Sequence, residues 1–149
     1  SLYHMLTKPM SHLDIFYTET VVPGQCTGPL KGGNLATLAS LVGTSHMPDL
    51  DGSVLFLEDI REPAYKIDRM LTQIKMAGAF KKLSGVICGT FEKCDNDEYI
   101  NDILLDIFHS FAVPVFRGLD CGHGKLNLSL PLGKTVHVDT NHPQLIWDL

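Results

Sequence analysis

Two continuous apolar runs mark the middle of this 149-residue chain. The first covers residues 54–57 and leads directly into Glu58 and Asp59, and the second covers residues 85–88. Apolar runs of this length, bounded by turn residues, are typical of strands that are buried on both faces. Open α/β sheets place their chemistry at the carboxyl ends of such strands, so Glu58 is either part of a site or a solvated strand end.

Three segments carry apolar residues at the spacing of a helix. Residues 35–41 follow Asn34, which is a favourable N-cap residue. Residues 63–77 begin with a proline, which the first turn of a helix tolerates, and then repeat apolar positions with helical period. Residues 95–97 are expected to open a third helix with a buried stripe of Tyr99, Ile103, Ile107 and Phe108.

The two flanks of the chain favour β structure. Residues 13–22 are rich in β-branched and aromatic types and predict a strand, whereas the glycine-rich residues 24–33 predict a loop. Residues 113–116 predict a short strand, and the segments after Gly118 that predict antiparallel strands are 126–130, 135–139 and 144–149. We therefore expect an α/β fold with a central sheet, flanking helices and a small antiparallel β layer.

Composition narrows the classes of function. A hydrophobic content of 44% and a charged content of 19% are ordinary for one soluble globular domain. The formal net charge of -5, without a basic stripe, argues against nucleic acid or an anionic membrane surface as the partner. No apolar stretch has the length needed to span a bilayer, and no signal-peptide pattern is present.

The four cysteines bear on the cellular compartment and on metal binding. Two disulfides are possible in an oxidising compartment, but Cys88 lies inside an apolar run and favours reduced thiols and a cytoplasmic location. A zinc site built from Cys88, Cys94, Cys121 and His123 is conceivable, although the spacing matches no compact zinc motif. We expect neither a metal nor a cofactor.

A histidine between two glycines is the second candidate for chemistry. Gly122-His123-Gly124 is either a surface turn or a backbone that can approach a ligand closely. An acid and a histidine are two thirds of a nucleophilic triad. No serine of the chain lies in a Gly-x-Ser-x-Gly elbow, so the sequence offers no nucleophile.

Three motifs in a fixed order resemble one family. They are Gly28-Pro-Leu-Lys-Gly-Gly-Asn-Leu35, Leu57-Glu58-Asp59-Ile60 and Gly122-His123-Gly124. In combination they resemble the serine LD-carboxypeptidases, which include muramoyltetrapeptide carboxypeptidases and the microcin C self-immunity proteins. The resemblance runs from about Gly24 to the C-terminus. Arg61 departs from it, because relatives often have a small residue there, and Ala36 stands where serine is frequent.

The resemblance implies a two-domain parent protein. Its first domain is a Rossmann-like α/β unit with the nucleophilic serine, and its second is a swivelling β/β/α unit. This chain resembles the second, with 13–149 as the domain and 1–12 as a remnant of the preceding domain or a linker. His123 matches the general base and Glu58 matches the acid that orients it. The implied reaction is hydrolysis of the L-D amide bond in murein tetrapeptides, and a homodimer is possible. We expect the fragment alone to be inactive.

Several alternatives stay open at this point. The parent could be an immunity-type relative that hydrolyses peptidyl-nucleotide toxins, or the chain could be a non-catalytic binding or association module. Asp59 could accept hydrogen bonds near the site or cap the helix over 63–77. Glu62 and Arg69 are expected to form a solvated face or an ion pair, and residues 32–34 either an anion site or only a turn and cap.

Overall fold

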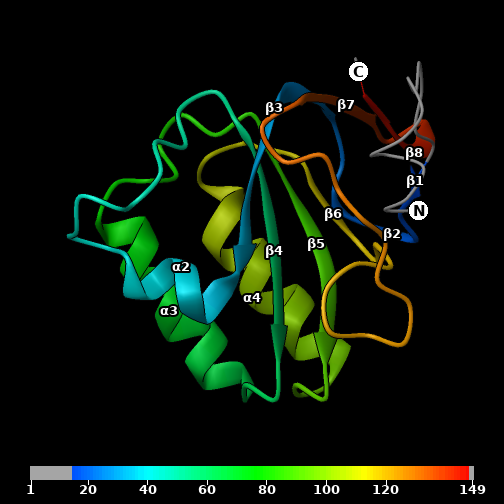
Figure 1. Cartoon of the computed structure of the whole chain (residues 1–149). Coiled ribbons are helices and arrows are strands. Elements are labelled where there is room, and N and C mark those ends of the chain that lie inside the picture. The colour runs from blue at the N-terminus through cyan, green and yellow to red at the C-terminus, as the bar shows by residue number, and fades with distance from the viewer. Residues whose placement is uncertain (1–14, 148–149) are drawn as a thin grey trace.

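A mixed sheet of eight strands, in the order β1-β8-β7-β3-β4-β5-β6-β2, forms the centre of the structure across residues 15–147 (Figure 1). This computed structural model describes those residues, so the proposed remnant at 1–12 lies outside them. The strands are β1 (Ile15–Phe16), β2 (Glu19–Val22), β3 (Gln25–Asn34), β4 (Val54–Ile60), β5 (Gly85–Glu92), β6 (Val115–Arg117), β7 (Thr135–Asp139) and β8 (His142–Trp147).

The middle of the sheet is parallel. Strands β3, β4, β5 and β6 run in one direction, and β4 and β5 match the two apolar runs of the sequence. At one edge β2 pairs antiparallel with β6, and at the other β7, β8 and β1 continue from β3 as antiparallel strands. The strands predicted over 54–59, 85–91 and 135–139 are therefore confirmed.

The loop predicted over 24–33 is wrong, because these residues form the long strand β3. Residues 25–29 pair antiparallel with β7 and residues 30–34 pair parallel with β4, so the strand changes partner at Pro29, which has no N–H to donate. A Cβ at Gly28 would collide with the carbonyl oxygen of Gly52, and a Cβ at Gly32 would collide with that of Phe56. The glycines therefore permit close backbone approach within a strand instead of marking a loop.

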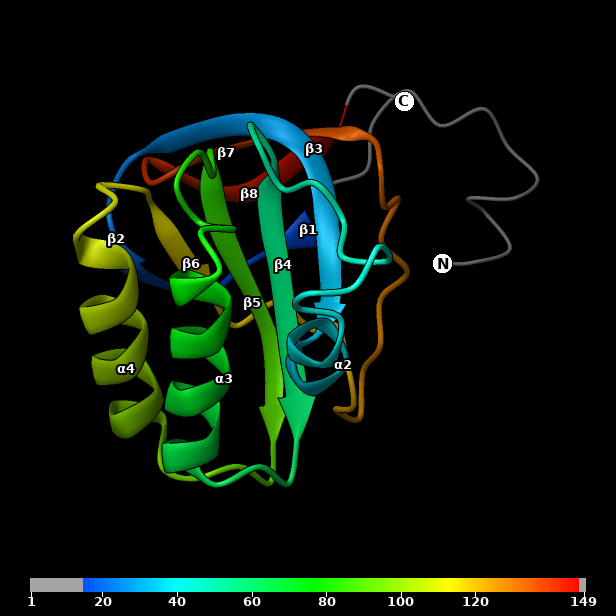
Figure 2. The same ribbon diagram turned by 90° about the vertical axis from the view of Figure 1, so that its left-hand side faces the viewer.

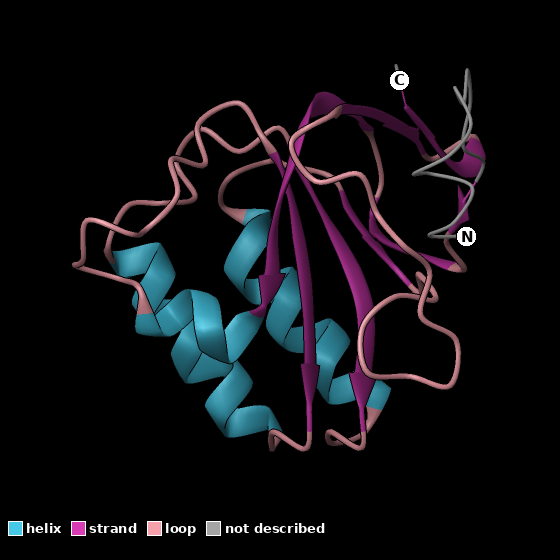
Figure 3. Ribbon diagram, in the orientation of Figure 1, coloured by secondary structure: helices cyan, strands magenta, loops and turns pink. Residues whose placement is uncertain are grey.

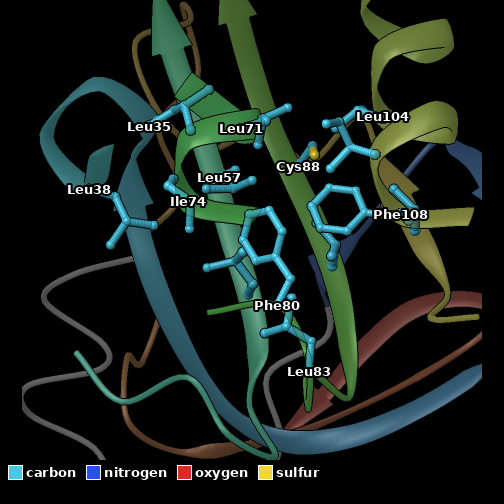
Figure 4. Close-up of a cluster of buried hydrophobic side chains, with 14 of the residues drawn as sticks. Leu35, Leu38, Leu57, Leu71, Ile74, Phe80, Leu83, Cys88, Leu104 and Phe108 are labelled. Carbon is cyan, nitrogen blue, oxygen red and sulfur yellow. The ribbon is translucent and has the colours of Figure 1, made fainter. Parts of the chain in front are cut away.

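Three helices of the described residues cover one face of the parallel strands: α2 (Leu35–Ser40), α3 (Ala64–Met76) and α4 (Asp97–His109) (Figure 2). Their apolar faces meet alternate residues of β4 and β5 in a first core, part of which Figure 4 shows. Phe80 and Phe108 pack there with ring centroids 4.9 Å apart. The predicted stripe of α4 is shifted: Ile100 and Leu104 are buried with Ile107 and Phe108, whereas Tyr99 is 60% exposed.

The opposite face of the parallel strands packs against the antiparallel strands, which curl over it (Figures 1 and 3). A second core fills this interface, with Phe56, Phe116, Leu145 and Trp147 among its buried members. The layers are thus helices, parallel strands and antiparallel strands, which confirms the expected α/β fold with its antiparallel layer. The strand predicted over 126–130 is wrong: these residues form no ladder, although Leu128 and Leu130 pack against the second core.

No helix within residues 15–147 is long and apolar enough to cross a membrane. All four cysteines lie in this part of the chain, and all are free. Burial raises the pKa of the Cys88 thiol to about 12, which is the behaviour of a small hydrophobic core residue.

Candidate active site

Strand alternation sends Glu58 and Asp59 to opposite faces of the sheet. Phe56 belongs to the second core and Leu57 to the first, because successive side chains of β4 point to opposite sides. Glu58 therefore lies on the same face of the sheet as Phe56, the face that the loop after β6 covers. Asp59 continues the side of Leu57, which faces the helices.

A β-bulge lies opposite Glu58. Leu57 pairs with Cys88 and Asp59 pairs with Phe91, so Gly89 and the residue after it face Glu58 alone. Such bulges bend a strand and redirect its side chains, and they are frequent next to active sites. The Glu58 residue is only 5% exposed, so its carboxylate lies in a largely desolvated position at the carboxyl end of β4.

The loop that follows β6 brings His123 to this carboxylate. His123 Nδ1 lies 2.7 Å from Glu58 Oε2, although the two residues are 65 positions apart. The imidazole is 48% exposed, whereas the Glu58 side chain is 7% exposed. A carboxylate only accepts hydrogen bonds, so Nδ1 carries the proton of this bond, and in the neutral ring Nε2 then has the free lone pair. The structure thus brings together the two residues that the sequence singled out.

Main-chain and side-chain bonds fix the conformation of this loop. The Thr90 N–H donates to the Cys121 carbonyl at 2.9 Å, which ties the loop to β5. The Gly122 N–H donates to Asn127 Oδ1 at 3.2 Å, and the Leu128 N–H donates to the Asp120 carbonyl at 2.8 Å. Asn127 was not among the predicted site residues, because it lies in the alternating segment 126–130 that predicts a strand.

Gly122 is required for the close approach. Its φ is +120°, a conformation that L side chains rarely adopt. A Cβ at this position would lie 2.7 Å from Glu58 Oε2 and 2.9 Å from Thr90 Oγ1. Any side chain would therefore push against the carboxylate that His123 contacts.

The pKa of His123 is raised above its ordinary value. The largest cause is the hydrogen bond to Glu58, and the next is the charge of the same carboxylate, since both favour the protonated imidazole. The more distant charge of Asp59 acts in the same direction, and the small desolvation of the ring opposes it. This arrangement stabilises the imidazolium that a general base forms when it accepts a proton.

Asp59 is bound to the start of α2. Its Oδ1 accepts from Asn34 Nδ2 at 3.0 Å and from the Ile60 N–H at 2.8 Å, and its Oδ2 accepts from the Ala36 N–H at 3.0 Å. The prediction that it caps the helix over 63–77 is wrong; there, the Ala64 N–H donates to Asp95 at 2.7 Å. Asp59 accepts hydrogen bonds, but at the start of α2 on the face opposite Glu58 and not at the site itself, so it stabilises α2.

The remaining candidates have structural roles. Asn34 caps α2 by accepting from the Thr37 N–H at 3.0 Å, which matches the turn-and-cap alternative for residues 32–34. Glu62 forms its ion pair with Lys66 at 3.3 Å. No group of His, Cys, Asp or Glu within the described residues is arranged to hold a metal ion. The hydroxyls of Ser40, Ser53 and Ser84 donate to main-chain carbonyls.

Comparison with known proteins assigns the chain to a family. The family model for the LD-carboxypeptidase C-terminal domain matches residues 27–138, which include both members of the contact. The chain belongs to the LD-carboxypeptidase family.

Named relatives agree with this assignment. The "Probable murein peptide carboxypeptidase" of Bacillus subtilis is 35% identical over 92% of this chain and 48% of its own length. The crystal structure of muramoyltetrapeptide carboxypeptidase from Oxalobacter formigenes superposes with a TM-score of 0.81 and 30% identity, over 98% of this chain and 52% of that one.

The immunity branch of the LD-carboxypeptidase family is similar to the chain as well. The "Microcin C7 self-immunity protein MccF" of Escherichia coli is 32% identical over 82% of this chain and 37% of its own length. Its structure in complex with glutamyl sulfamoyl guanosine has a TM-score of 0.77, at 30% identity over 91% of this chain and 41% of that one. The chain thus spans about half the length, or less, of the relatives that it matches.

Proposed function

We propose that this chain supplies the histidine and the glutamate of a Ser-His-Glu triad in a serine LD-carboxypeptidase. The observation that carries the proposal is the 2.7 Å contact between His123 Nδ1 and Glu58 Oε2, with the imidazole exposed toward solvent. The nucleophilic serine belongs to a preceding α/β domain of the parent protein. In this scheme residues 13–149 are the C-terminal domain, and residues 1–12 connect it to that first domain.

The roles follow from the hydrogen-bond geometry. His123 Nε2 accepts the serine proton as Oγ attacks the carbonyl carbon of the L-D amide bond in a murein tetrapeptide. His123 then protonates the amine of the departing D-residue, and a water molecule hydrolyses the acyl-enzyme by the same steps in reverse. Glu58 holds the imidazole in the required tautomer and stabilises its charged form. No residue of this chain takes the part of the nucleophile, so the 149-residue fragment is inactive by itself.

The test is hydrolysis of a murein tetrapeptide by the full-length protein and by its His123→Ala variant. Loss of a triad member should reduce turnover by about 10⁴-fold or more. The matched control is His109→Ala, which removes an exposed histidine at the far end of α4. Equal rates for His123→Ala and the unchanged protein would refute the triad assignment.

A second candidate function is the hydrolysis of peptidyl-nucleotides in a toxin-immunity protein. The similarity to MccF, which binds glutamyl sulfamoyl guanosine in its solved structure, favours it. The same assay separates the two when it includes an aminoacyl sulfamoyl nucleoside beside the murein peptide. A parent without an upstream domain bearing an exposed serine would instead favour a non-catalytic association module. The murein reading further implies a cytoplasmic enzyme that could act as a homodimer.

A further inference from the structure

Two basic residues with positive φ lie side by side at the carboxyl edge of the sheet. Arg61 has a φ of +59° and Lys93 has a φ of +54°. They directly follow β4 and β5, whose last residues, Ile60 and Glu92, are paired in register. The Arg61 N–H donates to the Glu92 carbonyl at 2.9 Å, which fixes the first turn against the second. Figure 1 shows the two strand ends next to each other.

Left-handed backbone at residues with a Cβ is strained, and such residues cluster at functional sites. Glycine would adopt both turns without this cost. Both turns carry a long basic side chain instead, so this part of the backbone holds two cations at neighbouring positions.

Among the described residues the two cations have no carboxylate partner. Arg61 and Lys93 are exposed, and no ion pair within residues 15–147 includes either of them. Two of the acids near the turns are engaged elsewhere. Glu62 pairs with Lys66 at 3.3 Å, and Asp95 accepts from the Ala64 N–H at 2.7 Å. A guanidinium and an ammonium group without partners are suited to bind an anion through charge-assisted hydrogen bonds.

We infer that Arg61 and Lys93 form a binding site for a carboxylate of the substrate peptide, beside the Glu58–His123 pair. This inference rests on the proposed function. Arg61 follows Glu58 by three residues, which is roughly 10 Å along a strand and within the span of a bound dipeptide and a long side chain. The terminal carboxylate of a carboxypeptidase substrate is only two bonds beyond the scissile nitrogen. A side-chain carboxylate of the peptide offers the same chemistry from a second source.

The test uses the full-length protein, its Arg61→Asn variant and the Arg61→Asn/Lys93→Asn double variant. Asparagine removes the charge yet tolerates positive φ, so the fold is retained. The probes are a peptide ending in D-alanine, its C-terminal amide, and a third peptide with a free terminus and amidated side-chain carboxylates. We expect KM for the free acid to rise about 10- to 100-fold in the double variant, with a smaller change in kcat. Lys81→Asn, an exposed cation at the opposite edge, is the matched control and should change nothing.

The amidated peptide whose KM is the same in the unchanged protein and in the variants identifies which carboxylate the two cations bind. If the amide is insensitive to both substitutions, the site binds the terminal carboxylate; if the third peptide is insensitive, it binds the side chain. Unchanged KM values for the free acid in the double variant would overturn the inference while the proposed function stood. If the unchanged protein cleaves none of the peptides, the proposed function fails, and calorimetric binding of the same peptides to the same variants decides the inference by itself.

Discussion

The helix side and the loop side of the end of β4 use neighbouring carboxylates in different ways. On the helix side, Asp59 is 2% exposed and accepts three hydrogen bonds from Asn34, Ala36 and Ile60. On the loop side, Glu58 is nearly as buried, but its partner is the half-exposed ring of His123. One acid is enclosed by the fold, and the other is connected to solvent through an imidazole.

This difference shows how one strand end can serve both folding and chemistry. The alternation of side chains separates the two acids by a single residue, so neither competes for the other's partner. A carboxylate that accepts its hydrogen bonds from a helix start and from its own strand stabilises the fold without facing a substrate. A carboxylate bonded to an exposed histidine can orient a general base. Substitutions at the two positions should therefore separate stability from turnover.

The largest expected effect is on turnover, from Glu58→Gln in the full-length protein. The substitution keeps the size of the side chain but removes the charge that fixes and stabilises the imidazole. Turnover of the murein tetrapeptide should fall on the order of 10⁴-fold, as it does when the orienting acid of a triad is neutralised. Steady-state kinetics measure it, and Glu62→Gln, which changes an acid on the following turn, should retain normal turnover. If Glu58→Gln kept more than a tenth of the activity, Glu58 would not be the acid that orients a catalytic histidine.

The next effect concerns the loop that carries His123. Gly122→Ala would place a Cβ 2.7 Å from Glu58 Oε2 on backbone with a φ of +120°. We expect kcat/KM to fall about 10²-fold, since a displacement of the base of about 1 Å is enough for such a loss. Gly133→Ala is the control, because a Cβ there meets nothing within 4 Å although φ is also positive, at +85°. Similar activities of the two variants would show that the close approach at Gly122 is not needed.

Local sequence patterns predicted the elements whose apolar residues have one clear period. The buried strands β4 and β5 and the helix α3 follow from runs and spacing alone. Strand β3 was not predicted, because the need for glycine at positions 28 and 32 comes from backbone segments distant in sequence that pack against them. The segment around Leu128 has strand-like alternation, yet it finds no neighbouring strand to pair with. Pairing partners lie far away in sequence, so composition does not encode them locally.

The site was predictable in part, for a similar reason. Glu58 and His123 stood out because a motif resemblance joined them, whereas nothing in their spacing indicates a contact across 65 positions. One of the two alternatives for Asp59, a cap of the helix over 63–77, named the wrong helix. The parallel pairing of β3 with β4, which places Asn34 beside Glu58, determines the partner of Asp59. Proximity in the sequence favoured the helix after β4 as the partner of Asp59, whereas strand pairing places the helix after β3 next to it.

On the helix side the expected effect is a loss of stability. In Asp59→Asn, one carboxylate oxygen becomes an NH₂ group, which would face either the Ala36 N–H or the Asn34 amide, both of which are donors. A buried donor left without an acceptor costs about 1–3 kcal/mol, so the free energy of unfolding should fall by that amount. Urea denaturation measures it, and Asp102→Asn on the exposed side of α4 should stay within about 0.5 kcal/mol. If Asp59→Asn proved as stable as the control, the helix side would lose its structural role.

The smallest effect sharpens the comparison, because both acids act on one imidazole. The pKa of His123 is raised first by the hydrogen bond and charge of Glu58 and only weakly by the charge of Asp59. The neutral imidazole is the active base, so the acidic limb of kcat/KM should lie above the ordinary histidine value of about 6.5. Titration of the His123 ring by NMR should show a lower pKa in Glu58→Gln and a smaller decrease in Asp59→Asn. Asp139→Asn, which changes a carboxylate paired with His142, should leave the ring unaffected. Equal shifts in the first two variants would mean that distance, and not the direct hydrogen bond, sets the influence of each carboxylate.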